Sequence, residues 1–175
     1  MEYVDTLDEH GNFTGVTKER SDTHRHGDWH RTVHVWIVNS AGEVLIQKRS
    51  PLKDRGANKW DMSCAGHISA GHKSNDTVIQ EVKEELGLTI TPEQLEYLFS
   101  VKEEEPNVRH FHDVFLVSFD FDLNKVQIQE EEVSEVRKLP YAELEKEINH
   151  SPDTFTDHKE EYERIFAILG ERNRA

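Results

Sequence analysis

The sequence has a single cysteine, Cys64, and few cationic side chains for its length. One thiol excludes an intramolecular disulfide and is typical of a protein from a reducing compartment. No apolar run approaches the roughly 18 to 20 residues needed to span a bilayer. The first residues also lack the basic and apolar regions of a secretory signal. These absences predict a cytoplasmic protein that does not insert into a membrane.

Positive charge is scarce: 35 Asp and Glu face 21 Lys and Arg, which gives a formal net charge of −14 at pH 7. Binding to a nucleic-acid polymer depends on clustered Lys and Arg, so we expect no such partner. A small phosphorylated substrate remains compatible, because a local basic stretch lies between residues 48 and 59. Arg49, Lys53 and Lys59 are the candidate phosphate-binding residues, with an ordinary solvated loop as the alternative.

The order of strand and helix signals predicts one mixed α/β domain over residues 1–175. Residues 1–29 read as a β-hairpin followed by a polar, His-rich loop. Further strands are expected at 33–38, 44–49, 62–68, 97–102, 109–121 and 133–139. Helices are expected at 76–86, 140–148 and 153–169, the last two forming a C-terminal helical part over residues 140–175. Because no regular strand–helix–strand repeat appears, we expect a mixed β-sheet between helices.

Three glutamates share one face of the helix expected at 76–86. At about 100° per residue, Glu81, Glu84 and Glu85 fall within an arc of roughly 100°, beside an apolar stripe. Carboxylates at this spacing repel one another, and no Lys or Arg stands three or four residues away on the same face to offset them. Hard oxygen ligands gathered in this way suit Mg²⁺ or Mn²⁺. A solvated acidic helix face is the alternative.

The flanking glycines extend this pattern. Residues 66–88, with Gly66 and Gly71 before the glutamates and Gly87 after them, resemble the Nudix box. That box reads Gly, five residues, Glu, seven residues, Arg-Glu, an aliphatic, any residue, Glu-Glu, any residue, Gly and an aliphatic. Residues 30–36 and 60–67 resemble the Nudix branch related to isopentenyl-diphosphate isomerase. The resemblance covers about residues 3 to 148, and it implies a Nudix fold with an N-terminal hairpin extension.

The resemblance also implies the chemistry. Glu81, Glu84 and Glu85 would hold Mg²⁺ or Mn²⁺, which offsets the charge of a diphosphate and activates water for attack on phosphorus. One of these carboxylates, or Glu132 in the acidic run 130–132, would serve as general base. The run 103–105 is a lower-ranked candidate. The implied activity is hydrolysis of a diphosphate linkage in a nucleoside diphosphate derivative or a similar small molecule.

Two positions depart from the box: His72 stands where the pattern has Glu, and Gln80 where it has Arg. In the family these two residues pair and brace the loop against the helix. Because both charged partners are missing together, no charge is left unpaired. We expect a neutral hydrogen bond between His72 and Gln80 and a retained metal site. A non-catalytic phosphate-ligand or metal-binding module is the alternative.

Cysteine position bears on the choice between hydrolase and isomerase. The isomerases place a catalytic cysteine directly before the Gly-His that is here Gly66-His67, where this chain has Ala65. Cys64 lies one residue earlier, and on a strand that shift points its side chain to the opposite face. We therefore expect Cys64 to be a small buried residue and favour hydrolysis, with isopentenyl-diphosphate delta-isomerase as the alternative.

A second metal site follows from the same resemblance. The isomerases bind an additional ion through three His and two Glu, and those positions fall here on histidines. His30 and His67 match directly, and His24 matches if one loop residue is deleted. The two Glu positions correspond to His110 and His112, which are two apart and so share a strand face. Imidazole ligands favour an ion such as Zn²⁺, Mn²⁺, Fe or Ni²⁺ over Mg²⁺. Scattered polar histidines, eleven in all, are the alternative.

The sequence leaves the identity of the small-molecule diphosphate substrate open. It leaves the oligomeric state open as well, and a homodimer is compatible with it.

Overall fold

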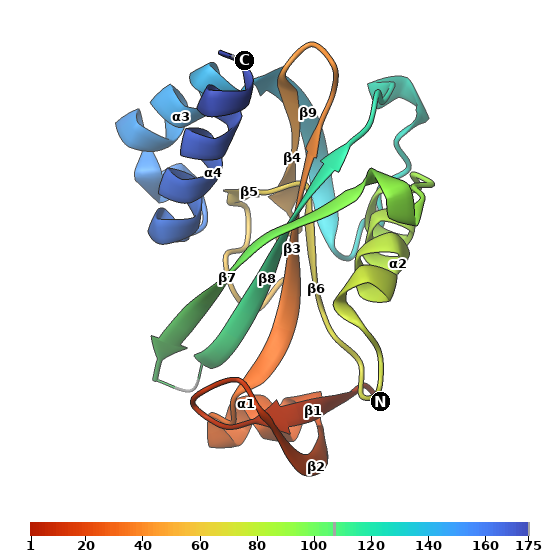
Figure 1. Ribbon diagram of the computed structural model, residues 1–175, viewed down its shortest axis with the longest axis vertical. Coiled ribbons are helices and arrows are strands. Elements are labelled where there is room, and N and C mark those ends of the chain that lie inside the picture. The colour runs from red at the N-terminus through yellow and green to blue at the C-terminus, as the bar shows by residue number, and fades with distance from the viewer. Residues whose placement is uncertain (107, 175) are drawn as a thin grey trace.

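The computed structural model describes residues 1–106 and 108–174. At the N-terminus, β1 (Tyr3–Leu7) and β2 (Phe13–Glu19) pair antiparallel, as the predicted hairpin. The Asp8 carboxylate closes the turn by accepting the backbone N–H groups of His10 and Asn12, both at 2.9 Å. The hairpin lies at one end of the molecule, below the main sheet in Figure 1.

The His-rich segment after the hairpin is a helix, α1 (Arg20–His26), so the expectation of a loop was wrong. The segment has no apolar periodicity that would indicate a helix. It is held locally instead: the Thr23 hydroxyl donates to the Glu19 carbonyl at 3.0 Å, and Arg25 pairs with Asp22 at 2.9 Å. The helix ends at Gly27, whose φ of 66° is left-handed.

The main sheet is mixed, as predicted. Its central strand β3 (His30–Val38) runs parallel to β8 (Val108–Ser118), whereas the other pairs are antiparallel. The strand order is β5-β4-β3-β8-β7, with β6 added to β3 and β9 added to β4. The remaining bounds are β4 (Glu43–Arg49), β5 (Trp60–Asp61), β6 (Cys64–His67), β7 (Leu95–Glu105) and β9 (Val133–Pro140).

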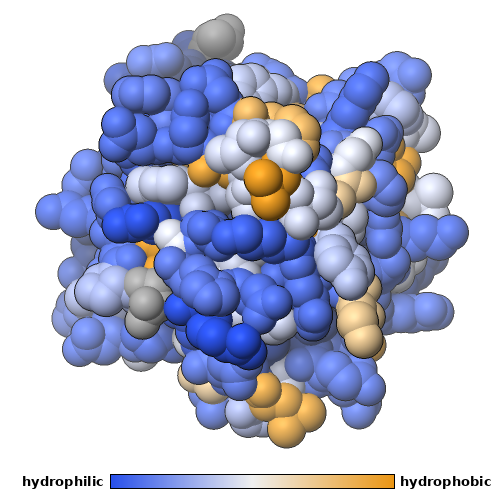
Figure 2. Space-filling model, turned by 90° about the horizontal axis from the view of Figure 1, so that it is seen from below, coloured by the Kyte–Doolittle hydropathy of each residue, from blue (hydrophilic) through white to orange (hydrophobic). Residues whose placement is uncertain are grey.

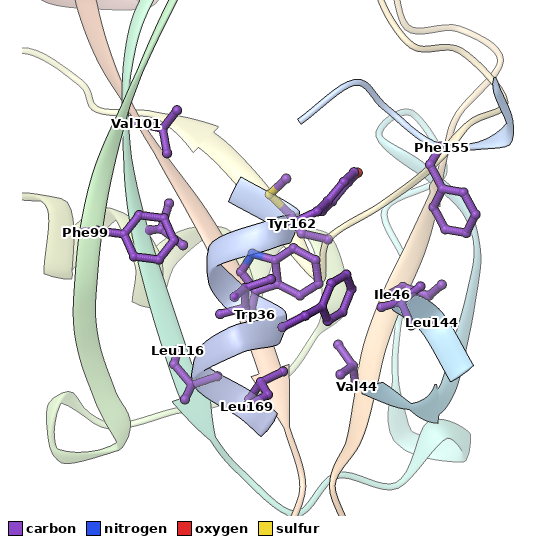
Figure 3. Close-up of a cluster of buried hydrophobic side chains, with 14 of the residues drawn as sticks. Trp36, Val44, Ile46, Phe99, Val101, Leu116, Leu144, Phe155, Tyr162 and Leu169 are labelled. Atoms are coloured by element: carbon purple, nitrogen blue, oxygen red, sulfur yellow. The ribbon is translucent and has the colours of Figure 1, made fainter. Parts of the chain in front are cut away.

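Helices cover both faces of this sheet (Figure 1). Alternate residues of β3 point to opposite sides: Val33, Val35 and Ile37 pack with α2 (Ser74–Leu86). Trp36 points the other way and lies in a second core with α3 (Tyr141–His150) and α4 (Lys159–Arg172), as Figure 3 shows. The terminal helix expected from residue 153 begins instead at Lys159, after a 3-10 turn at Pro152–Thr154.

The face that carries Trp36 changes character along the sheet. Toward the hairpin, the inward positions of β3 are His30, Thr32 and His34 in place of apolar residues, and all three are buried. The parallel register sets His30 opposite His110 and Thr32 opposite His112. The apolar core under α3 and α4 is therefore continuous with a buried, imidazole-rich region.

The surface is strongly hydrophilic. The view in Figure 2, from the hairpin end, shows polar residues over most of the molecule and small, separate apolar patches. Exposed large apolar side chains on the hairpin include Tyr3, Phe13 and Val16. Among the described residues, no helix is both long enough and apolar enough to cross a membrane.

Candidate functional site

Two of the three predicted glutamates on α2 point inward. The Glu81 carboxylate lies directly against Gly66 of β6, so close that any Cβ at position 66 would overlap it. Glu85 is 5% exposed and accepts the Gln47 side-chain amide at 3.2 Å. Glu84 is exposed at the surface of the helix. Glycine is therefore required at position 66 because a side chain there would occupy the space of the Glu81 carboxylate.

The surroundings of Glu81 and Glu85 disfavour the ionised forms of both side chains. Burial, with repulsion from Glu84 as the next cause, raises the pKa of Glu81 to about 7. Burial and repulsion from Glu81 raise the pKa of Glu85 to about 8. Lys53 acts on both in the opposite direction. A divalent cation would remove this repulsion, and carboxylate oxygens are its preferred ligands.

A loop before β9 brings a fourth carboxylate to the same place. The Gln129 N–H donates to the Glu85 carbonyl at 3.1 Å, and Ser50 N–H donates to the Glu132 carbonyl at 2.9 Å. The Glu132 side chain forms an ion pair with Lys53, and its charge raises the pKa of both inward glutamates. Glu132, 47 positions beyond Glu85 in sequence, is thus assembled with the α2 carboxylates.

The three candidate phosphate-binding residues lie in three different places. Lys53 lies beside the glutamates through Glu132. Arg49 pairs with Asp61 at 3.2 Å and donates to the Arg55 carbonyl at 3.1 Å. Lys59 lines a cavity at α3 and α4. Of these three, the structure places Lys53 next to the carboxylates.

Gln80 makes a different contact from the one expected. Its side-chain amide donates to the Glu84 carboxylate at 2.9 Å, and the expected hydrogen bond to His72 is not formed in the described part of the chain. Residues four apart on a helix are neighbours, whereas His72 lies in the loop that precedes α2. The pairing that would brace this loop is absent, and Gln80 instead orients one of the candidate metal ligands.

Gln47, on β4, is a site residue that the sequence did not indicate. Its amide nitrogen holds Glu85, while its Oε1 is buried with no hydrogen-bond partner in the described residues. Buried polar atoms are normally satisfied, so an orphaned oxygen beside two carboxylates fits the donor set of a bound cation. Gln47 follows the apolar residues Val44 to Ile46 of β4 and precedes Lys48 and Arg49, so the sequence gives no signal that marks it as a site residue.

Four of the five predicted histidines meet on the opposite face of the sheet. Nitrogens of His24, His30, His67 and His110 all lie within 4.8 Å of one another, and His24 Nε2 is 3.1 Å from His30 Nε2. They come from α1, β3, β6 and β8. Helix α1, the element expected to be a loop, is what carries His24 into the cluster.

The fifth histidine, His112, is displaced by one step along β8. Its Nδ1 shares a hydrogen bond with the Thr32 hydroxyl and its Nε2 with Glu103, both at 2.6 Å. Together with His110 it forms a neighbouring group around Glu103. His110 therefore belongs to both groups, and His112 adjoins the cluster without being one of the four.

The four-histidine cluster has the properties of an ion-binding site. Burial lowers the pKa of His30 to about 3 and that of His67 well below its usual range, which favours the neutral imidazoles that bind metals. The Nε2 atoms of His67 and His110 are buried without a hydrogen-bond partner in the described residues. Unpaired buried nitrogens aimed into a cluster of imidazoles fit a transition-metal ion.

Comparison with known proteins bears on the family and the fold of this chain. Residues 28–159 match the NUDIX domain. This chain belongs to the Nudix family. It is 37% identical over 182 residues to Nudix hydrolase 3 of Arabidopsis thaliana, covering 98% of this chain but 24% of the plant protein. An isopentenyl-diphosphate Delta-isomerase of Aliivibrio fischeri is 29% identical over 163 residues, or 89% of each chain. The Deinococcus radiodurans protein DR0079 has a similar fold, with a TM-score of 0.75 and 21% identity over 93% of this chain and 98% of that one.

These matches confirm the predicted Nudix family, the Nudix fold and the similarity to the isomerase branch. They identify a Nudix domain in a chain that is similar to proteins named Nudix hydrolases. The plant relative is about four times longer than the part that matches, so its other regions have no counterpart in this alignment.

The cysteine of this Nudix domain lies where the strand alternation predicts. Cys64 is fully buried in the core that contains α2, and burial raises the pKa of its thiol well above the usual range. Ala65 packs against the opposite core. Since the chain has no other cysteine, no thiol reaches the histidine-rich face. This arrangement removes the catalytic cysteine that the isomerase resemblance would require.

A third group of ligand-type side chains was not anticipated. His34, His158 and Glu161 offer atoms within 4.8 Å of one another. His34 Nδ1 is 2.7 Å from Glu161 Oε2, and the Trp36 indole donates to Glu161 Oε1 at 2.8 Å. Two of the three residues lie at the start of α4, more than 120 positions after His34, in a segment for which the sequence predicted a terminal helix and no site.

Proposed function

We propose that this Nudix domain hydrolyses a diphosphate linkage in a nucleoside diphosphate derivative or a similar small molecule, with Mg²⁺ or Mn²⁺ held by Glu81, Glu84 and Glu85. The observation that carries the proposal is the inward pair, Glu81 and Glu85: Glu81 packs against Gly66, and burial together with neighbouring carboxylates raises the pKa of both. Buried carboxylates that repel one another cost stability unless a cation joins them.

Each neighbouring residue has a part in this proposal. Glu81, Glu84 and Glu85 would hold a divalent ion, which would offset the charge of the diphosphate and lower the pKa of a water molecule for attack on phosphorus. Glu132 accepts the proton as the water oxygen bonds to phosphorus and the bridging P–O bond breaks. Lys53 holds Glu132 in place and adds a cation beside the phosphate oxygens. Gln47 fixes the orientation of Glu85.

A substrate screen with matched variants tests this function. Nucleoside di- and triphosphates, nucleotide sugars, dinucleotides and isopentenyl diphosphate are incubated with Mg²⁺ or Mn²⁺, and phosphate products and isomers are measured. Glu132→Gln, which removes the proposed general base, and Glu85→Gln, which removes a proposed metal ligand, should each lower kcat/KM by about 100-fold or more. Glu131→Gln, at an exposed neighbour of Glu132, should leave the rate unchanged.

The outcomes separate the alternatives. Hydrolysis that survives Glu85→Gln and Glu132→Gln contradicts the assignment of the site. Interconversion of allylic diphosphates in place of hydrolysis would establish the isomerase despite Ala65. Binding without turnover of any compound in the panel would favour the non-catalytic module.

We also infer that His24, His30, His67 and His110 bind a transition-metal ion such as Zn²⁺, Mn²⁺, Fe or Ni²⁺. The two orphaned Nε2 atoms support this inference, as does the origin of the four ligands in four different elements. An ion there would tie α1 to the sheet. Metal analysis of protein purified without a His-tag should find about one equivalent, and His67→Gln should remove it. Absence of stoichiometric metal after soaking in Zn²⁺ or Mn²⁺ would contradict the inference.

A further inference from the structure

We propose that His34, His158 and Glu161 form a separate ion site, in which two imidazole nitrogens and one carboxylate oxygen bind Zn²⁺ or a similar borderline divalent ion. It is distinct from the Nudix carboxylates, which lie on the α2 face of the sheet, and from the four-histidine cluster. The site would sit between the middle of β3 and the first turn of α4.

The local geometry gathers the three ligands. His158 is the N-cap residue of α4 and Glu161 stands three positions later, in the first turn. Residues three apart on a helix share a side, so both face β3, where His34 points inward. Their donor atoms lie within 4.8 Å of one another. The side chains of His34 and Glu161 are 6% and 1% exposed, whereas that of His158 is 18% exposed and forms the opening to solvent.

The charge balance of this pocket calls for a cation. Glu161 is buried, and in the described residues its polar contacts are the Trp36 indole and the His34 ring, with no Lys or Arg in salt-bridge range. The nearby carboxylate Asp61 does have a fixed cation, Arg49 at 3.2 Å. A buried carboxylate without a fixed positive partner is costly, and a divalent ion shared with two imidazoles would supply the missing charge.

A purely structural role explains less of the arrangement. Trp36 and His34 alone suffice to fasten Glu161, and with it α4, to the sheet. His158 adds a third nitrogen that this fastening does not use: its closest charged neighbour, Asp61, is 4.0 Å away, while its ring centre is 4.9 Å from that of His34. Two His and one carboxylate, with a solvent-facing position left over, is the ligand set of zinc sites that keep one coordination position free.

The site adjoins the four-histidine cluster through His112. The ring of His112 stacks on His34 at 4.0 Å and lies 5.3 Å from the ring of His110. One face of the sheet would then carry two ions in neighbouring positions. Because Gly66 and His67 are consecutive on β6 and point to opposite faces, neither ion replaces the one expected at the Nudix glutamates.

Equilibrium dialysis with Co²⁺ tests the proposal independently of any enzymatic activity. The chain with His24→Gln and His67→Gln lacks two ligands of the four-histidine cluster but keeps the proposed site, and excess Mg²⁺ occupies the carboxylates of α2. This chain should still bind about one Co²⁺, with a visible absorption band. Adding His158→Gln should weaken that binding by about tenfold or more. His150→Gln, at an exposed histidine of α3, is the matched control and should have no effect.

Glu161→Gln separates ion binding from helix docking. The substituted side chain retains an oxygen that can accept from Trp36, so α4 should stay docked while Co²⁺ binding weakens by about tenfold or more. Circular dichroism checks the fold of each variant, and His158→Gln removes no hydrogen bond present in the structure. The proposal is overturned if the doubly substituted chain binds no Co²⁺, or if His158→Gln binds it as tightly as the control.

Discussion

Replacing Glu85 by Gln should make the metal-free domain more stable above neutral pH, although it removes a proposed metal ligand. Glu85 is buried and its pKa is raised from 4.5 to about 8. Without an ion, the folded state therefore favours the protonated form of this side chain. Gln resembles that neutral form in shape, and its oxygen can still accept the Gln47 amide.

The direction and size of this stability effect follow from the linkage between proton binding and folding. Between the two pKa values the folded chain holds a proton that the unfolded chain has released, so the free energy of unfolding falls as pH rises. One pKa unit is worth about 1.4 kcal/mol, and from about pH 6 to pH 8 Glu85 should cost about 2 kcal/mol of stability. For a domain of this size that corresponds to about 4 to 8 °C in Tm. The lost stability should return when Mg²⁺ is added, because binding to the folded state alone stabilises it.

Urea unfolding in a chelating buffer at several pH values measures this directly. The difference between Glu85→Gln and the unsubstituted chain should grow with pH over that interval, and Mg²⁺ should stabilise the unsubstituted chain far more than the variant. Using the difference cancels the titration of groups common to both chains. An equal slope in the two chains, or a stability difference between them that shrinks as pH rises over that interval, would refute the reasoning.

Three further predictions follow from the site geometry. Gly66→Ala should fold but displace the flexible Glu81 side chain. Mg²⁺ binding measured by calorimetry should therefore weaken by about tenfold or more. An unchanged affinity would contradict the packing of Glu81 against Gly66. Chelation of a transition metal from the histidine cluster should loosen α1, so that trypsin cleaves after Arg25 faster than in the metal-loaded protein. Equal cleavage rates would show that no metal bound to His24 holds α1 to the sheet. Burial depresses the pKa of His30 to about 3, so the metal-free chain should lose stability as pH falls below about 6.5, and His30→Gln should reduce that loss in urea titrations.

The sequence predicted those parts of the fold whose cause is local. Strand alternation in β3 and β8, the helical period of α2 and the glycine that ends it all depend on neighbouring residues, and each of these elements lies where expected. Helix α1 was missed because its stability comes from a Thr23 hydrogen bond and from burial against the hairpin, with no apolar stripe in the sequence. The expected start of α4 at residue 153 was too early, because residues 153–158, which include weak helix formers such as Thr and Asp, fold as a 3-10 turn and a non-helical link.

For the candidate site, spacing alone was informative where all the residues lie on one element. Glu81, Glu84 and Glu85 share a helix, so their common side follows from the sequence, and the family match supports the chemistry proposed for them. Which of them turn inward does not follow, because that depends on the room left by Gly66 on another strand. The direction taken by Gln80, toward Glu84 in place of His72, was decided in the same way by the path of the loop.

By itself the sequence predicted the family and the acidic helix, and it named the four histidines that the structure brings together. The tertiary structure alone decided what meets across long distances: Glu132 with Lys53 beside α2, and His34 with Glu161 across the sheet. The physical reason is that a side chain's neighbours along the chain set its direction, but its partners are set by packing. Here packing places the Glu81 carboxylate against Gly66 on one face of β6 and the four-histidine cluster at the next residue, His67, on the other face.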